Sequence, residues 1–120
     1  MKQIALVEDN PDNRLLVQAM LGDIFDITEY ESGEAAVARL AENRPDLVLL
    51  DISMPAMDGP EVLHYIRSVE SLKGLPVIAL TAHAMAGDKE KYLEMGFDHY
   101  LTKPILDEEI LIEAINSLLD

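Results

Sequence analysis

Five short apolar runs are spaced along the chain, and four of them end in polar residues with a definite chemical use. They are residues 4–7 followed by Glu8-Asp9, residues 47–50 followed by Asp51, residues 77–80 followed by Thr81, and residues 100–102 followed by Lys103. The fifth run, residues 25–30, carries no such group. Helical patterns lie between the runs, and this alternation is typical of a parallel sheet covered by helices on both faces. The carboxyl ends of such strands meet at one edge, where open α/β sheets bind their ligands.

The pattern predicts an α/β fold with five strands and five helices. The runs 47–50 and 77–80 are continuously apolar, as expected of strands buried on both faces, whereas the mixed run 25–30 suits an edge strand. Helices are expected to begin after the caps Asn10 and Ser32, to cover residues 60–71 and 89–95, the latter ending at Gly96, and to begin again near Asp107. The expected inward stripes are Leu15, Leu16, Ala19 and Met20; Ala36, Val37, Leu40 and Ala41; Val62, Leu63 and Ile66; and Leu111, Ala114, Ile115 and Leu118.

Length and composition indicate one domain with a substantial apolar core. The chain has 120 residues, 49% of them hydrophobic, and no cysteine, so neither a disulfide framework nor a thiolate metal site is available. No apolar stretch approaches the ~20 residues that span a bilayer. The N-terminal residues run straight into a predicted strand, which leaves no visible signal peptide. We therefore expect a cytoplasmic protein that is not inserted in a membrane.

The charge balance is strongly acidic. The chain has 9 Lys and Arg against 23 Asp and Glu, a formal net charge of −14. Such a surface repels phosphate backbones, so we expect no direct binding of nucleic acid. Two interpretations of the acidity remain open, namely solubility and attraction of cations and basic partner surfaces.

The carboxylates of Glu8, Asp9 and Asp51 are expected to meet at the carboxyl edge of the sheet. Two carboxylates ~5 Å apart repel by roughly 3 kcal/mol at an effective dielectric constant near 20, a large cost for a marginally stable domain. A divalent cation removes that cost, and magnesium, which prefers oxygen ligands, binds through one or two carboxylates while keeping several waters. Together with the ammonium of Lys103, a magnesium ion balances the three negative charges.

Asp51 is the natural nucleophile of this pocket. The chain lacks cysteine, and no Ser-His-Asp arrangement can be read from the strand ends. A carboxylate can attack phosphorus directly to form an acyl phosphate, a reaction that depends mainly on positioning and charge neutralisation. Lys103 would neutralise the transferring oxygens, and Thr81 could donate a hydrogen bond to one of them.

Four motifs give the chain a specific resemblance to the receiver domain of bacterial two-component response regulators, over essentially all 120 residues. They are Val7-Glu8-Asp9-Asn10, the segment from Asp51 to Gly59, Thr81-Ala82-His83-Ala84 and Tyr100-Leu101-Thr102-Lys103-Pro104. The resemblance implies a flavodoxin-like, doubly wound sheet of order 2-1-3-4-5. It implies one receiver domain over residues 1–120 with no output domain, acting as a phosphorylation-dependent signalling switch.

The resemblance also assigns roles to individual residues. Asp51 resembles the phosphoacceptor, with phosphate arriving from a phosphohistidine on a sensor histidine kinase or a histidine phosphotransfer protein. Lys103 resembles the phosphate-pairing lysine, and its bond to Pro104 is expected to be cis. Thr81 and Tyr100 resemble a switch pair that would change the binding surface for a downstream protein. The resemblance also implies a bound magnesium ion, with manganese as the alternative. The implied ligands of this cation are Glu8, Asp9, Asp51 and the backbone carbonyl of Ser53.

Two departures and two plain interpretations accompany these roles. Glu8 stands where Asp is commoner in the family. Ser53 and His83 occupy positions that, in the family, influence how long the phosphoryl group lasts. Asp58-Gly59 is interpreted as a simple turn. The three histidines, which are His64, His83 and His99, are interpreted as non-ligands.

Three other functions remain as alternatives. A flavin-binding electron carrier on the same fold would need a phosphate loop after the first strand, where this chain has acidic residues. A magnesium-dependent phosphohydrolase would need a second acid two residues after Asp51, where Ser53 stands. A degenerate receiver that serves as a scaffold is the third alternative, although every residue of the active pattern is present.

Overall fold

In the residues that the computed structural model describes, which are 1–82, 85–103, 105 and 107–119, five strands form one parallel sheet. The strands are β1 (Gln3–Val7), β2 (Asp26–Tyr30), β3 (Leu47–Asp51), β4 (Val77–Thr81) and β5 (His99–Thr102). Their order is β2-β1-β3-β4-β5, and each neighbouring pair is parallel. The flavodoxin-like order predicted from the sequence is therefore confirmed, with β2 at an edge.

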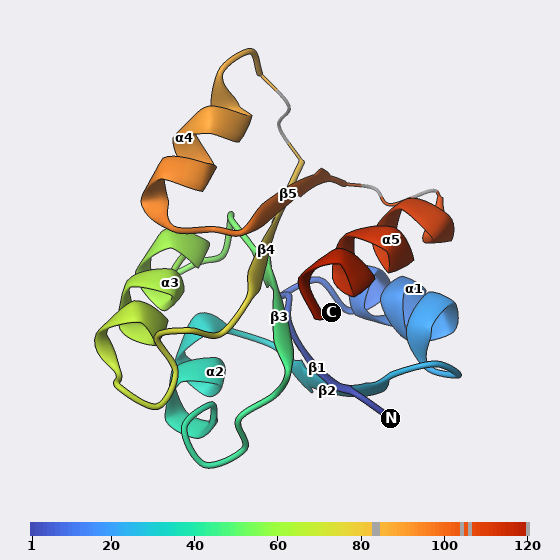
Figure 1. Ribbon diagram of the computed structural model, residues 1–120, viewed down its shortest axis with the longest axis horizontal. Coiled ribbons are helices and arrows are strands. Elements are labelled where there is room, and N and C mark those ends of the chain that lie inside the picture. The colour runs from blue at the N-terminus through green and yellow to red at the C-terminus, as the bar shows by residue number, and fades with distance from the viewer. Residues whose placement is uncertain (83–84, 104, 106, 120) are drawn as a thin grey trace.

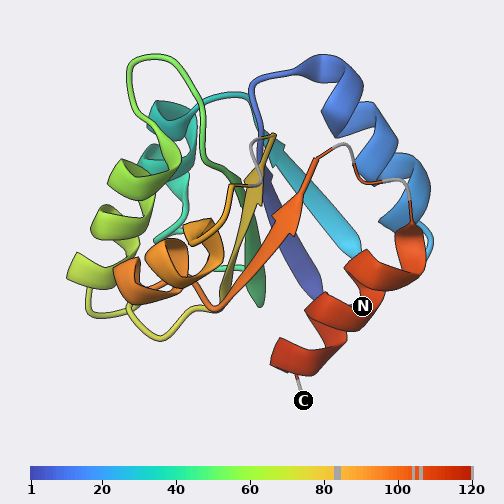
Figure 2. The same ribbon diagram turned by 90° about the horizontal axis from the view of Figure 1, so that it is seen from above.

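Helices connect the strands and cover both faces of the sheet. Within the described part of the chain they are α1 (Pro11–Leu21), α2 (Gly33–Arg39), α3 (Gly59–Ser68), α4 (Asp88–Met95) and α5 (Glu108–Leu119). Helices α1 and α5 lie on one face, and α2, α3 and α4 lie on the other (Figures 1 and 2). This placement makes a three-layer molecule in which the sheet is the middle layer.

The sheet separates two apolar cores, and the central strands contribute to both. On β3, Val48 and Leu50 face the core under α2, α3 and α4, whereas Leu47 and Leu49 face the core under α1 and α5. All four side chains are fully buried. Because side chains alternate along a strand, a strand covered on both faces must be apolar throughout. The continuous apolar runs in the sequence have this origin.

The helix caps follow the sequence, but one inward stripe does not. Asn10 accepts a hydrogen bond from the backbone N–H of Asp12 at 2.8 Å, and Ser32 accepts one from Ala35 at 3.0 Å. In α1 the predicted stripe is displaced by about one residue: Leu16 and Met20 are half-buried as expected, but Leu15 is 71% exposed, while Val17 and Leu21 are buried. Apolar residues occupy both sides of α1, so its periodicity does not decide which side faces the sheet. Other predicted stripe members also lie exposed: Ala19 and Ala41.

The segment between β3 and α3 corrects a second expectation. Asp58-Gly59 is no simple turn, because Asp58 caps α3 and Gly59 is its first residue. The carboxylate of Asp58 accepts a hydrogen bond from the backbone of Glu61 at 3.0 Å, and the Glu61 carboxylate accepts one from the backbone of Asp58 at 3.2 Å. The helix also ends earlier than expected, at Ser68, because Val69 has extended backbone angles.

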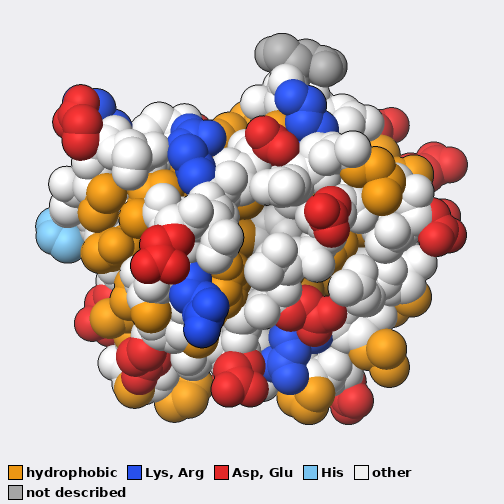
Figure 3. Space-filling model, turned by 90° about the horizontal axis from the view of Figure 1, so that it is seen from below, with side chains coloured by type: hydrophobic (Ala, Val, Ile, Leu, Met, Phe, Trp, Pro, Cys, Tyr) orange, Lys and Arg blue, Asp and Glu red, His pale blue; other side chains and the backbone are white. Residues whose placement is uncertain are grey.

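The outer surface mixes charges of both signs. Figure 3 shows a face on which acidic, basic and apolar side chains are interspersed rather than segregated. No helix among the described residues is long and apolar enough to cross a bilayer. On this face, acidic side chains are therefore spread among basic and apolar ones (Figure 3).

Gly59 allows the start of α3 to approach the end of β3, and we expect Gly59→Ala to destabilise the fold. A Cβ at this position would lie 2.5 Å from the carbonyl oxygen of Asp51 and 2.8 Å from the Cα of Ile52, and both are backbone atoms that cannot move aside cheaply. We expect a loss of about 1–3 kcal/mol in the free energy of unfolding, measured by urea titration. Gly74→Ala is the matched control, because a Cβ there meets nothing within 4 Å. Equal stability of the two variants would contradict this account.

Candidate functional site

The parallel register of the sheet gathers the predicted site residues at one edge. Asp51 and Thr81 are the last residues of β3 and β4, Glu8 and Asp9 follow β1, and Lys103 follows β5. Val7 pairs with Leu50, Asp51 with Leu80, and Thr81 with Thr102, so these strands end nearly level with one another. The sheet therefore brings together side chains that are far apart in the sequence.

The Lys103 ammonium joins two buried carboxylates. Its Nζ lies 3.0 Å from Glu8 Oε1 and 3.0 Å from Asp51 Oδ1. The side chains are 14% exposed for Lys103, 1% for Glu8 and 2% for Asp51. The backbone N–H of Lys103 also donates to the carbonyl of Thr81 at 2.7 Å, which fixes the start of the segment that follows β5. The amine and hydroxyl thus lie at the same edge as the acids, as the sequence predicted.

Glu8 is held by further donors from the start of α1. Its carboxylate accepts hydrogen bonds from the backbone N–H of Asn10 at 3.2 Å and from Asn13 Nδ2 at 3.4 Å. Arg14 Nη1 donates to the backbone carbonyl of Glu8 at 2.8 Å, and its Nε lies 3.3 Å from Glu29 on β2. Sequence reasoning missed Asn13 and Arg14. The available signal was their position in the first turn of a helix that starts at the pocket.

The acidic residues form a cluster whose chemistry suits a hard cation. Glu8, Asp9 and Asp51 each offer a carboxylate oxygen, and these oxygens lie within 4.8 Å of one another. Asp9 is exposed, so the cluster opens to solvent on that side. Residues around the open cleft are Glu8, Asp9, Asn10, Asn13, Asp51, Ser53, Ala82 and Lys103. An all-oxygen donor set with an open side fits magnesium, which binds few protein carboxylates and retains waters.

The electrostatics of the cleft point the same way. Burial, together with the hydrogen bond and negative charge of Glu8, raises the pKa of Asp51 to about 7 against the opposing effect of Lys103. Burial alone would lower the pKa of Lys103, but Glu8 and Asp51 outweigh it and hold that pKa above its ordinary value. One ammonium therefore does not fully compensate the clustered acids, and a further positive charge would be stabilised here.

Three other predicted residues lie around this centre. Ser53 is exposed at the cleft, and its backbone N–H donates to Asp51 Oδ1 at 3.3 Å. Thr81 is 2% exposed. Tyr100 is half-buried on β5, where it pairs with Ala79, two residues before Thr81 on the same face of the sheet.

The remaining sequence expectations fall elsewhere. His64 lies exposed on α3 and His99 is half-buried on β5. His83 and the Lys103–Pro104 peptide bond lie outside the described residues, so their expected roles are not addressed by the structure.

Comparison with known proteins connects this geometry to a family. The model described as the response regulator receiver domain matches residues 4–116. The sensor protein GacS of Pseudomonas syringae pv. syringae is 44% identical over 112 residues, which are 90% of this chain and 12% of that protein. The chain therefore spans about an eighth of the length of that relative.

A response regulator and an isolated receiver domain match over nearly their whole length. The polar-differentiation response regulator DivK of Brucella ovis is 38% identical over 123 residues, covering 98% of this chain and 96% of that one. The receiver domain of sensor histidine kinase PA1611 from Pseudomonas aeruginosa is 35% identical with a TM-score of 0.89, covering 98% of this chain and 97% of that one. That structure has a magnesium ion coordinated in its active-site cleft.

The raised pKa of Asp51 makes a prediction about pH. Its carboxyl binds a proton more readily in the folded protein than in the unfolded chain, whose pKa stays near 3.8. As pH rises from 3.8 towards 7, the unfolded chain loses this proton first, so the metal-free protein should lose stability. At 1.36 kcal/mol per pKa unit the loss is on the order of 4 kcal/mol, and it is complete above about pH 7.

Urea unfolding across this pH range measures the effect. Because other groups also titrate, the informative quantity is the difference in unfolding free energy between the wild type and Asp51→Asn. We expect that difference to change over the window between 3.8 and about 7, and saturating Mg²⁺ to reduce the change. A difference that is flat with pH would show that burial does not hold a proton on Asp51.

Proposed function

The chain belongs to the family of response regulator receiver domains of two-component signalling, and we propose that it is a phosphorylation-dependent switch with Asp51 as the phosphoacceptor. The observation that carries the proposal is the placement of Asp51, buried at the base of an acidic cleft, with the Lys103 ammonium 3.0 Å from its carboxylate. Family membership favours this function over the flavin carrier and the phosphohydrolase. We propose that residues 1–120 form a single receiver domain.

In the proposed reaction, a carboxylate oxygen of Asp51 attacks the phosphorus of a phosphohistidine. The O–P bond forms as the P–N bond breaks, and the departing imidazole keeps the electron pair and takes up a proton. Lys103 would pair with the transferred phosphoryl oxygens, and the Thr81 hydroxyl would donate a hydrogen bond to one of them. Glu8, Asp9, Asp51 and the backbone carbonyl of Ser53 would hold magnesium, or manganese in its place. When bound, the cation would neutralise charge on the phosphoryl group.

Phosphorylation would then act through Thr81 and Tyr100. It replaces one negative charge at Asp51 with roughly two and adds oxygen acceptors. Thr81 would move to meet the new acceptor, and Tyr100 would turn into the space that Thr81 leaves. The local change in charge would thereby alter the surface formed by α4, β5 and α5.

The partners follow from this chemistry. A sensor histidine kinase or a histidine phosphotransfer protein would supply the phosphoryl group, and a downstream protein would read the altered surface. The net charge of −14 argues against nucleic acid as a direct partner. We propose that this exchange takes place in the cytoplasm.

Phosphorylation itself can be measured by mass. The protein is mixed with a small acyl-phosphate donor and Mg²⁺, and the intact mass and peptide masses are recorded. We expect a mass gain of one phosphoryl group that maps to Asp51 and vanishes in Asp51→Asn. Asp23→Asn is the matched control, because Asp23 is an exposed carboxylate in the turn before β2. Modification at another residue would contradict the assignment of Asp51, and no modification of the wild type would favour a receiver that serves only as a scaffold.

Binding of magnesium should be visible as added stability. At 100 times its dissociation constant, a ligand that binds the folded state alone adds about 2.7 kcal/mol to the unfolding free energy. We expect a magnesium-dependent rise in the thermal unfolding temperature that is lost in Asp9→Asn. Asp12→Asn is the matched control, because Asp12 is an exposed acid of the first turn of α1 outside the cluster. Equal loss in both variants would point to nonspecific screening.

A further inference from the structure

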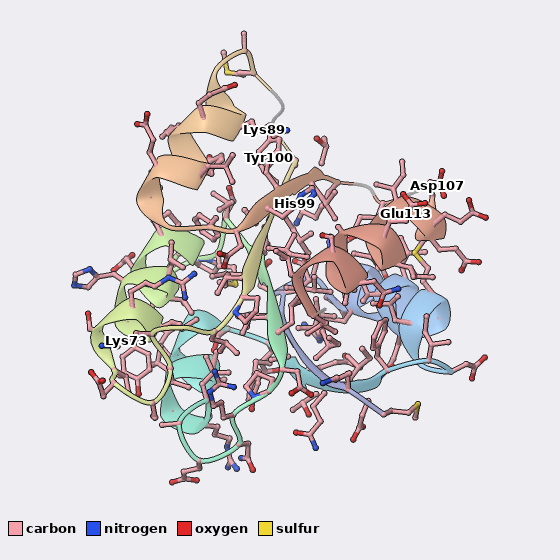
Figure 4. The ribbon with its side chains drawn as sticks, in the orientation of Figure 1. Lys73, Lys89, His99, Tyr100, Asp107 and Glu113 are labelled. Carbon is pink, nitrogen blue, oxygen red and sulfur yellow. The ribbon has the colours of Figure 1, made fainter. Side chains whose placement is uncertain are left out.

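Three aromatic rings connect α4 to β5. The Tyr92 and Tyr100 rings are stacked, with centroids 5.7 Å apart and planes inclined by 19°. Tyr92 also makes an edge-to-face contact with Phe97, in which the ring centroids lie 5.9 Å apart and the ring planes are inclined by 89°. Tyr92 is 9% exposed. In Figure 4, Tyr100 lies on the side of β5 that faces α4. Tyr100, the residue expected to turn on phosphorylation, thus packs against a ring carried by the neighbouring helix.

Tyr92 is the main anchor of α4 to the rest of the protein. Among the eight residues of this helix, all of them described, Tyr92 is the buried one. Burial and the nearby Asp88 carboxylate raise the pKa of the Tyr92 phenol above its ordinary value, which keeps the ring neutral. The helix begins after Gly87, which has no side chain to cap it. Displacing the ring of Tyr92 would therefore release the middle of α4.

The carboxyl end of α4 is held separately, by an arginine from α3. Arg67 Nη2 donates to the carbonyl of Gly96 at 2.7 Å and to Asp98 Oδ2 at 3.0 Å. Its Nη1 donates to the carbonyl of Leu75 at 2.6 Å. These contacts do not involve Tyr100, so they would survive a movement of its ring. Helix α4 consequently has a fixed carboxyl end and a second attachment that depends on the Tyr92–Tyr100 stack.

Tyr100 cannot turn towards Thr81 and keep this stack unless α4 follows. In the register of β4 and β5, Tyr100 lies opposite Ala79 and Thr102 lies opposite Thr81. The space beside Thr81 is therefore displaced from Tyr100 along the strand direction. Tyr92, by contrast, approaches the ring from the helical layer. A ring that moves along the sheet slides off a partner fixed above it, and the contact between the two rings is lost.

We propose that Tyr92 is a positioning residue that holds Tyr100 in its resting place by stacking, and so opposes activation while coupling Tyr100 to α4. The inference rests on the proposed switch. It adds a residue that shifts the balance between the resting and the activated forms. If Tyr92 served as core packing alone, its replacement would lower the stability of the fold and leave the balance between resting and activated forms unchanged.

The test uses fluoroberyllate, a stable mimic of the phosphoryl group, in the presence of Mg²⁺. Its dissociation constant is measured by calorimetry for the wild type, for three variants at Tyr92 and Tyr65, and for Asp51→Asn. We expect Tyr92→Leu to tighten binding about two- to tenfold, the range that one aromatic pair is worth. Tyr92→Phe keeps a ring that can stack and should bind within twofold of the wild type. Tyr65→Leu should also match the wild type, because Tyr65 is a half-buried tyrosine on α3 outside the stack. Unchanged or weaker binding by Tyr92→Leu overturns the inference.

A second measurement uses the wild type alone and does not depend on the stability of any variant. Nuclear Overhauser contacts between the rings of Tyr92 and Tyr100 should be present in the unliganded protein and weaken when fluoroberyllate and Mg²⁺ bind. Contacts that persist in the bound state overturn the inference. A wild type that does not bind fluoroberyllate, or that binds it equally after Asp51→Asn, overturns the proposed function and this inference with it. Binding that requires Asp51 but ignores Tyr92 overturns the inference alone.

Discussion

A single ammonium between two buried carboxylates determines the arrangement of this cleft. Lys103 Nζ lies 3.0 Å from Glu8 and from Asp51, and so ties the end of β5 to the ends of β1 and β3. Removing one partner of a buried ion pair leaves an uncompensated charge in a poorly solvated place, which is strongly destabilising. The hydrogen-bond donors around Glu8 also stabilise this arrangement, because Asn13 and Arg14 hold Glu8 where it contacts Lys103.

The same arrangement leaves the cleft short of positive charge, which is what makes it chemically responsive. Three carboxylates share one ammonium, and the raised pKa of Asp51 records the imbalance. A bound cation would relieve this imbalance, and a transferred phosphoryl group would change it again. The buried core under the cleft is close-packed and cannot adjust continuously. In the proposed switch, the response would fall on Thr81 at the end of β4, on Tyr100 on β5 and, through the stacked ring, on Tyr92.

The sequence was sufficient for the fold and for the centre of the cleft because both follow from strand periodicity. Continuous apolar runs such as Leu47–Leu50 identify central strands, and the polar residue after each run must lie at the carboxyl edge. The predicted stripe of α1 was displaced by about one residue because Leu15, Leu16 and Val17 are all apolar, and the choice of Val17 over Leu15 depends on packing against the sheet. The close approach of Gly59 to the end of β3 and the contacts of Arg14 were not predicted, because they join segments whose approach no local sequence pattern records.

The bond between Glu8 and Lys103 spans 95 positions of the chain, from the first strand to the last. A polypeptide whose synthesis has not yet reached β5 carries Glu8, Asp9 and Asp51 but lacks the Lys103 ammonium that pairs with two of them. Such an incomplete chain cannot form the bond that joins the end of β1 to the end of β5. The cleft is therefore completed only when β5, the last of the five strands to be synthesised, pairs with β4.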